Sequence, residues 1–213
     1  MADNNNQVFE ETYRKYLGDV QKLNGAEIAK RLGLHKEAEA LIVPMFGKRY
    51  TLTPQGLKDG EGKRPPIGIC VTLLRYLLLC PEGVLFPRPD VWKAYRDFKA
   101  AGPLLVYFAN DCEMPITRAF TGRIDALRGA CERIGGEKSD LDLPYQVAYV
   151  IEALPTISLL VLFNDGDDEF PAACSLLYSE HADRYLDAEC LAILANILAS
   201  CLIDMADVKG EKS

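Results

Sequence analysis

Two apolar runs separated by an acidic turn constrain the fold of this chain more than any other stretch. The first run, residues 156–163, is apolar on both faces, which is typical of a strand inside a sheet. The second run, residues 170–178, alternates between apolar and other side chains, and Pro171 places its start at an edge or a bulge. Asp165-Gly166 between the two runs predicts a tight type I′ hairpin turn. We therefore expect an antiparallel hairpin at the centre of the fold.

The rest of the chain predicts helices and short strands that cover this hairpin. A strand at 145–151 extends it into a meander, and the apolar stretches 67–80 and 188–205 predict buried helices, the second of them capped by Asp187. The other predicted elements are helices at 8–23, 26–32 (capped by Asn24 and ended by Gly33), 91–101 (capped by Asp90) and 115–133, strands at 40–46 and 49–53 around a tight turn at Gly47-Lys48, and a surface loop at 53–66. We expect a single α+β domain over residues 8–205, with an antiparallel sheet covered by helices and disordered tails at 1–7 and 206–213.

Composition excludes some classes of partner. The chain has 213 residues, is 49% hydrophobic, and carries a formal charge of −7, which argues against nucleic acid because phosphate binding needs clustered cations. The apolar stretch 145–163 is long enough to suggest a membrane span, but Glu152 and Pro155 interrupt it. We expect two buried strands there and no membrane partner.

The seven cysteines are scattered and predict free thiols. No C-x-x-C pair occurs, and residues 1–7 are polar and carry no apolar core of a secretory signal. Buried thiols in a reducing cytoplasm explain this pattern better than disulfides. We therefore expect a cytoplasmic protein, and no local motif predicts a metal site.

The acidic turn supplies most of the candidate binding residues, which are Asp165, Asp167, Asp168 and Glu169. Acidic turns are common, and the simplest interpretation is a solvated turn that stops an edge strand from pairing with other chains. The alternative is a docking point for a basic partner or a site for a hard cation. The spacing does not match a calcium loop of the EF-hand type.

Arg75 and His181 are the two further candidates. Arg75 lies in the apolar stretch 67–80, where a guanidinium either extends to the surface or pairs with a carboxylate, such as Glu152 or the acidic turn. His181 follows the second run and is close in sequence to Asp183, so it could act as a general base. A histidine at the start of a helix is the commoner interpretation.

No complete catalytic motif accompanies these residues. The sequence contains no G-x-S-x-G or H-E-x-x-H, and the glycines of 53–66 do not have the spacing of a phosphate-binding loop. The sequence therefore does not decide whether the chain is an enzyme, and it identifies no catalytic residue and no cofactor.

The C-terminal third contains a series of short segments, which are Leu154-Pro155, Gly166-Asp167, Glu169-Phe170-Pro171-Ala172, Leu177-Tyr178 and Tyr185-Leu186. This series resembles the signature of DUF3786, a family of domains of unknown function. The stretches MFGKRYTLT and LLRYLLL are also similar to earlier segments of the family, so the resemblance covers most of the chain from about the second helix onward. The resemblance implies a protein of anaerobic bacteria or archaea. Some relatives carry a cysteine cluster that suggests iron–sulfur chemistry, and this chain departs from them because it has no such cluster.

Three functional hypotheses follow. The first is a non-catalytic binding or accessory module for a redox or one-carbon system of an anaerobe, with a protein partner at the acidic turn. The second is an enzyme whose site is assembled from the acidic turn, His181 and Arg75. The third is a homo-oligomeric structural or interaction protein that uses the hairpin edge, and the sequence does not give its oligomeric state.

Overall fold

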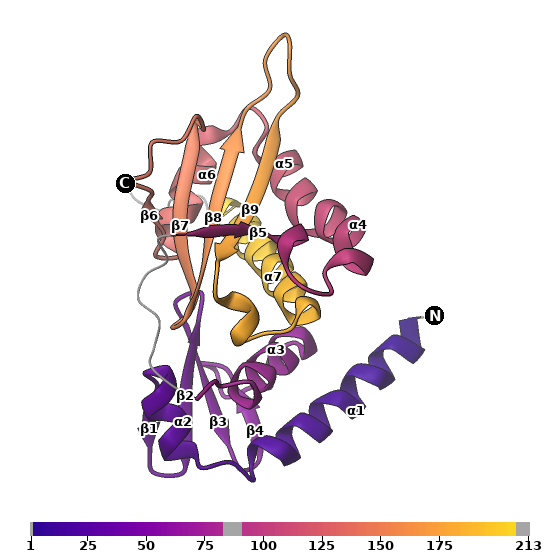
Figure 1. Cartoon of the computed structure of the whole chain (residues 1–213), viewed down its shortest axis with the longest axis vertical. Helices are drawn as coiled ribbons and strands as arrows, with labels where there is room; N and C mark the ends of the chain where they lie inside the picture. Colours follow the sequence, from indigo (N-terminus) through magenta and orange to yellow (C-terminus); the bar gives the residue numbers. More distant parts are fainter. Residues whose placement is uncertain (1, 83–90, 208–213) are drawn as a thin grey trace.

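The computed structural model of the protein describes residues 2–82 and 91–207. The predicted helix cap Asp90 and the predicted tail beyond Asp207 lie outside the described residues. The chain forms two antiparallel sheets that follow each other along the longest axis of the molecule (Figure 1). An α+β fold with antiparallel sheets is confirmed, although the sequence analysis expected one sheet.

The first sheet has the strand order β1-β2-β3-β4 and the second has the order β5-β9-β8-β7-β6. The strands of the first sheet are β1 (His35–Glu37), β2 (Ala40–Met45), β3 (Lys48–Thr53) and β4 (Gly56–Lys58). The strands of the second sheet are β5 (Trp92–Ala94), β6 (Glu137–Lys138), β7 (Val147–Leu154), β8 (Ile157–Asn164) and β9 (Ala173–Ser179).

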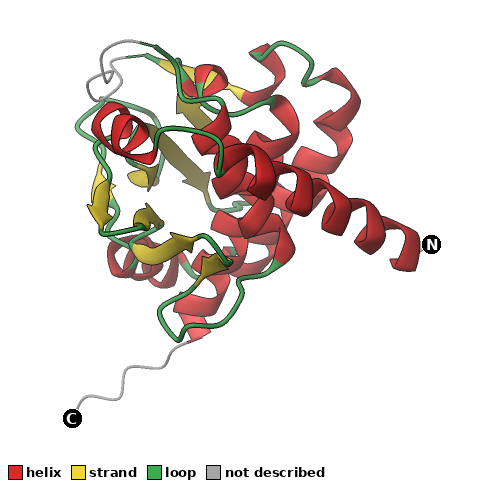
Figure 2. Ribbon diagram, turned by 90° about the horizontal axis from the view of Figure 1, so that it is seen from below, coloured by secondary structure: helices red, strands yellow, loops and turns green. Residues whose placement is uncertain are grey.

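The helices are α1 (Ala2–Val20), α2 (Gly25–Leu32), α3 (Ile67–Leu78), α4 (Leu105–Tyr107), α5 (Met114–Phe120), α6 (Ile124–Arg133) and α7 (Ala188–Asp207). Short 3₁₀ helices occur at Tyr95–Asp97, Gly102–Leu104 and Ala182–Arg184, and a π-helix occurs at Phe108–Glu113. Helix α1 packs on α3, and its N-terminal end projects away from the rest of the molecule (Figure 2).

The predicted meander is confirmed. Strand β8 lies between β7 and β9, with Leu160 opposite Leu177 and Val161 opposite Leu176. Leu160 and Val161 point to opposite faces of the sheet, and neither has any exposed surface. Burial on both faces explains why residues 156–163 have no polar face, and it is why the apolar stretch 145–163 forms two strands rather than one helix.

The predicted tight turn at Asp165-Gly166 is wrong. Strand β8 ends at Asn164 and β9 begins at Ala173, and their pairing closes a loop of residues 165–172, called the acidic loop below. Gly166 does not take the positive φ that a type I′ turn requires. Phe170, which alternation placed on the buried face of the second strand, is 65% exposed in this loop.

A tight reversal does occur between β2 and β3, where the sequence predicted one, but its central residues are Phe46 and Gly47 rather than Gly47 and Lys48. Phe46 and Gly47 have φ values of 48° and 72°, as both central residues of a type I′ turn do, and Met45 pairs with Lys48 on either side. Phe46 is only 4% exposed, and its N–H donates to the carbonyl of Ala153 in β7 over 3.0 Å. This turn therefore joins the first sheet to the second.

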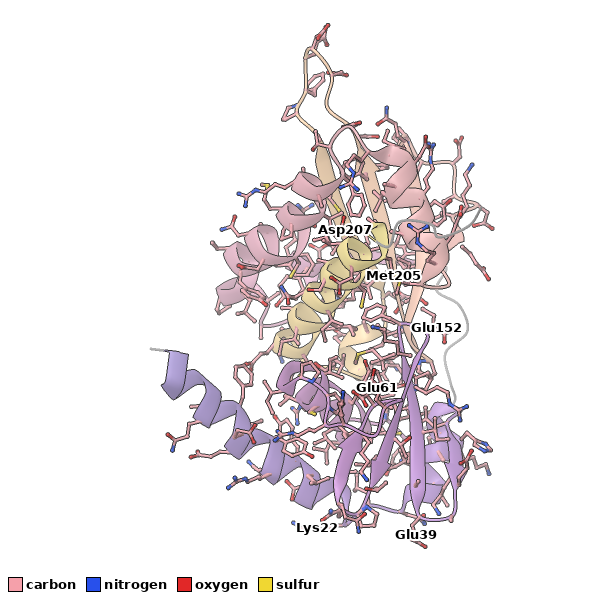
Figure 3. The ribbon with its side chains drawn as sticks, turned by 180° about the vertical axis from the view of Figure 1, so that it is seen from behind. Lys22, Glu39, Glu61, Glu152, Met205 and Asp207 are labelled. Atoms are coloured by element: carbon pink, nitrogen blue, oxygen red, sulfur yellow. The ribbon has the colours of Figure 1, made fainter. Side chains whose placement is uncertain are left out.

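The β7 side of this junction is irregular. The register of the β7–β8 pair shifts between Glu152 and Leu154, which is the signature of a β-bulge. Glu152 lies where β7 meets the tip of the β2–β3 hairpin (Figure 3). Ala153, whose carbonyl accepts the Phe46 N–H, lies within this irregularity.

The two predicted buried helices are confirmed as α3 and α7. Helix α7 contacts α3, α5 and α6 behind the second sheet (Figure 1). Within the described chain, α7 is the one helix long and apolar enough to cross a membrane, and 44% of that apolar window is buried inside the fold. Such burial is typical of the core helix of a folded domain, so the length and composition of α7 are weak grounds for a membrane span.

Several helix boundaries differ from the prediction. Helix α1 begins at Ala2, where a disordered segment was expected through residue 7, and the predicted helix 91–101 is instead β5 followed by a 3₁₀ turn. The predicted helix 115–133 is divided into α5 and α6. The predicted loop 53–66 contains strand β4, which forms because Leu57 is buried against the core. Asn24 caps α2 and Gly33 ends it with φ 64°, as the sequence predicted.

Candidate functional site

The acidic loop extends beyond the body of the molecule from the end of the second sheet (Figure 1). Its base is fixed by Asp165, whose carboxylate accepts the N–H of Gly122 at 2.9 and 3.0 Å. The N–H of Asp165 donates to the side-chain oxygen of Gln146 over 2.6 Å. Gly122 follows α5 and Gln146 precedes β7, so two other segments of the chain hold the start of the loop.

Asp167 organises the outer part of the same loop. Its carboxylate accepts the N–H groups of Phe170 at 2.7 Å and Glu169 at 2.8 Å, and its own N–H donates to the carbonyl of Phe170 over 2.9 Å. The N–H of Phe170, and then that of Glu169, lowers the pKa of the Asp167 carboxyl from its ordinary value. Asp165 and Asp167 therefore act mainly inside the loop, where they fix its conformation.

The remaining loop side chains face solvent. Asp168, Glu169 and Phe170 are all exposed, so two exposed carboxylates directly precede an exposed aromatic ring. The alternation of residues 170–178 concealed Phe170, because a loop with internal hydrogen bonds is not visible in a period-two pattern. The signal that could have revealed it is Asp167, which is three residues before Phe170 and can accept backbone N–H groups in such a turn.

Arg75 has a structural partner. Its Nε donates to Oδ2 of Asp187 over 2.7 Å, and its guanidinium lies 5.5 Å from the ring centroid of Tyr16. The other carboxylate oxygen of Asp187 accepts the N–H of Cys190 and so caps α7, as the sequence predicted for Asp187. Pairing with a carboxylate was expected for Arg75, but the partners suggested for it, Glu152 and the acidic turn, are wrong.

His181 lies at the start of the short 3₁₀ helix Ala182–Arg184, and its side chain does not cap that helix. Its Nε2 is 3.2 Å from Oε1 of Glu180. The carboxylate expected beside it, that of Asp183, lies 3.7 Å from the ammonium of Lys93 instead. His181 is thus placed among surface charges at the end of β9 that is remote from the acidic loop.

The structure does not bring the candidate residues together. The acidic loop precedes β9 and His181 follows it, and a strand of this length separates them by about 20 Å. Arg75 lies on α3 against the start of α7, away from the acidic loop. The assembled active site of the second hypothesis therefore has no geometric basis, because its members do not face one space.

The described residues contain no cluster of side chains suited to binding a metal ion. No group of three or more histidine, cysteine, aspartate or glutamate side chains among the described residues could hold a metal ion. All seven cysteines are free thiols, and five of them are buried. Burial raises the pKa of Cys131 to about 12, so this thiol stays protonated and is a poor metal ligand.

The described residues define an α+β protein with a projecting acidic loop, and they do not bring the acidic loop, Arg75 and His181 together. The chain belongs to the family described as Domain of unknown function (DUF3786), whose model matches residues 24–200. The match confirms the resemblance and its expected extent, since it runs from the start of α2 to the last turns of α7. The search of curated proteins and the search of solved structures gave no match.

Proposed function

We propose that this protein is a non-catalytic accessory module that binds a protein partner through its acidic loop. The observation that carries the proposal is the 65% exposed ring of Phe170 at a loop whose shape is fixed by hydrogen bonds that the carboxylates of Asp165 and Asp167 accept. Exposed aromatic side chains on a fixed backbone are frequent anchors in protein interfaces, since little entropy is lost when they bind.

The chemistry of the loop indicates the kind of surface that it fits. Asp168 and Glu169 precede Phe170 and are exposed, so the partner should offer an apolar pocket for the ring beside lysine or arginine side chains. Charges at the rim of such a contact mainly accelerate association, and salt weakens their effect. We expect the partner to belong to a redox or one-carbon system, as proposed from the sequence.

The third hypothesis, a homo-oligomer formed at the hairpin edge, has less support. Strand β5 pairs with β9 from Leu177 to Ser179, so this part of β9 is already occupied. The outer strands of the second sheet, β5 and β6, have three and two residues, and edges this short offer little backbone for pairing with a second copy.

Photo-crosslinking tests the proposal. Phe170 is replaced by benzoylphenylalanine, which keeps an aromatic side chain, and the chain is irradiated in extract of its native host. The same replacement at Tyr107, an exposed aromatic residue on α4, is the matched control. We expect a discrete adduct from position 170 that position 107 does not give.

A competition step gives the decisive comparison. Excess unmodified protein should suppress the adduct, and excess protein carrying Asp168→Lys and Glu169→Lys should not. The proposal is wrong if both positions give the same adducts, or if the charge-reversed protein competes as well as the unmodified one.

A further inference from the structure

A groove of about 950 Å³ lies between the first sheet and α7, away from the acidic loop. Its walls are the start of β3, the loop after β4, the first turn of α3, and the face of α7 that carries Ile193, Ile197 and Cys201. This volume is within the range of small-molecule binding sites. No sequence pattern marks the groove, because its walls come from four segments that are distant along the chain.

Tyr50 is the feature of the groove that points to a ligand. Its side chain lines the groove and is only 6% exposed, yet its hydroxyl makes no hydrogen bond to any described residue. The rest of Tyr50 is buried, while its hydroxyl reaches solvent in the groove with its hydrogen-bonding capacity unused, so it is available to donate to a bound group. Burial raises the pKa of the Tyr50 phenol, which keeps the proton available for donation.

The start of α3 supplies further donors to the same groove. Pro66 precedes the helix and provides no side-chain cap, so the first backbone N–H groups of α3 have no partner of that kind. Pro65, Gly68 and Ile69 from this segment line the groove. A negatively charged group is stabilised at such a helix start by the N–H groups and by the helix dipole.

The charged side chains that line the groove are mixed: Lys48 and Arg49 are positive, and Asp59, Glu61 and Asp204 are negative. Lys48 is two residues before Tyr50 on β3, so their side chains share a face, and the ammonium of Lys48 makes no ion pair with the described residues. The carboxylate of Asp59 already accepts the N–H groups of Glu61 and Lys63. Glu61, which lies between the first sheet and α7 (Figure 3), is paired with Lys63 at 2.7 Å.

The far end of the groove has the opposite character. Asp204 lies three turns along α7 from Ile193, which corresponds to about 16 Å, and it makes no ion pair with the described residues. Ile193 contacts the start of α3 so closely that a Cβ on Gly68 would lie 3.3 Å from it. A ligand that bridges these ends would therefore place its negative group near α3 and keep it away from Asp204.

We propose that this groove binds a small organic anion. The carboxylate or phosphate of the ligand accepts from the Tyr50 hydroxyl and from the first N–H groups of α3. Its apolar body lies along Ile69, Ile193 and Ile197. The inference is independent of the acidic loop, which lies at the end of the second sheet.

Four probes with the same alkyl chain test the ligand class by isothermal titration calorimetry of the full chain. They are octanoate, octyl phosphate, octan-1-ol and octylammonium. We expect at least one of the two anions to bind about tenfold or more tightly than the alcohol, with octylammonium weakest. The two anions distinguish a carboxylate ligand from a phosphate ester, and equal or tighter binding of the alcohol or the ammonium would overturn the proposal.

A variant isolates the hydroxyl. Tyr50→Phe keeps the buried ring, and Tyr107→Phe removes an exposed hydroxyl elsewhere and serves as the control. We expect Tyr50→Phe to weaken the preferred anion about tenfold and to leave octan-1-ol unchanged. Tyr107→Phe should change neither affinity. Equal anion affinity of Tyr50→Phe and the unmodified protein, or no measurable binding of either anion, would show that the groove is not an anion site.

Discussion

Two chain reversals of this protein contrast in sequence, burial and conformation. The acidic loop contains the Asp-Gly pair that predicts a tight turn, yet it is long, exposed and closed by hydrogen bonds of Asp165 and Asp167. The β2–β3 turn has a bulky aromatic residue, Phe46, at a positive φ, yet it is a two-residue turn in which the Phe46 side chain is buried. The contrast shows that contacts outside the turn can outweigh its local sequence preference.

The physical reason differs at the two places. Phe46 takes a backbone conformation that costs free energy for a side chain of its size, and burial of its ring together with the N–H bond to Ala153 offsets that cost. At Asp165 the carboxylate bonds to Gly122 outside the hairpin, so the residue is not available for the local turn. The first reversal should therefore be important for stability, and the second should be important for recognition.

The largest expected effect separates the two aromatic residues. Phe46→Ala should lower the free energy of unfolding by about 3 kcal/mol, because it removes a buried ring from the junction of the sheets. Phe170→Ala should change it by less than about 0.5 kcal/mol, because the ring is exposed. Urea unfolding of both variants measures the difference, and similar losses for the two would remove the distinction between the reversals.

The next effect concerns the base of the acidic loop. Asp165→Ala removes the acceptor of the Gly122 N–H and should cost about 1 to 2 kcal/mol, whereas Asp168→Ala should have little effect on stability. Thermal unfolding and the amide resonance of Gly122 report the change. A Gly122 resonance that is unaltered in Asp165→Ala would show that this contact does not hold the loop.

Replacement by asparagine should have different effects on stability at the glycines of the two reversals. Gly47→Ala should cost about 1 kcal/mol because of its positive φ, and Gly47→Asn should recover most of the loss, since asparagine tolerates this conformation. At Gly166 a Cβ would lie 3.1 Å from the N atom of Ala172, so alanine and asparagine should be equally unfavourable. Chemical denaturation of the four variants tests this, and recovery by Gly166→Asn would contradict the account.

The smallest expected effect depends on pH and concerns Glu113. Its carboxylate accepts the N–H of Leu176 in β9, the strand that follows the acidic loop. Burial raises the pKa of Glu113 above its ordinary value of 4.5, against the opposing effects of that N–H and of Arg96. Because the folded state holds the proton more tightly, this group favours folding below pH 4.5 and loses that contribution as the pH rises through its folded pKa.

Glu113→Gln cannot ionise and still offers an oxygen to Leu176. Its stability relative to the unmodified protein should therefore increase as the pH rises from about 4 towards neutrality. Urea unfolding across this range measures the difference, which should be smaller than the effects above. A difference that is constant with pH would show that Glu113 does not titrate in this window.

The sequence predicted the parts of the fold whose preferences are local or whose burial is uniform. The apolar runs of β7 and β8, the caps of α2, and the cap of α7 at Asp187 were all visible as patterns. It could not predict β4, β5 and β6, because strands of two or three residues form only through their partners. The division of the strands into two sheets was not visible in the sequence for the same reason.

The candidate site was predicted in part. The four carboxylates were identified, but their division into two that fix the loop and two that face solvent depends on Gly122, which is distant in sequence. The exposure of Phe170 and the groove around Tyr50 arise from tertiary packing, which no periodic pattern contains. The predicted partners of Arg75 failed because Asp187 is brought to it only by the packing of α7 on α3.

The most direct test of the account is amide hydrogen exchange within the acidic loop. The account predicts that the N–H groups of Glu169 and Phe170, which donate to Asp167, exchange more slowly than the N–H of Asp168, for which the described residues provide no acceptor. Asp168 lies between the two halves of this bonded turn and is an internal control. Equal exchange at all three positions would mean that the loop is not preformed, and the proposed partner site would lose its structural basis.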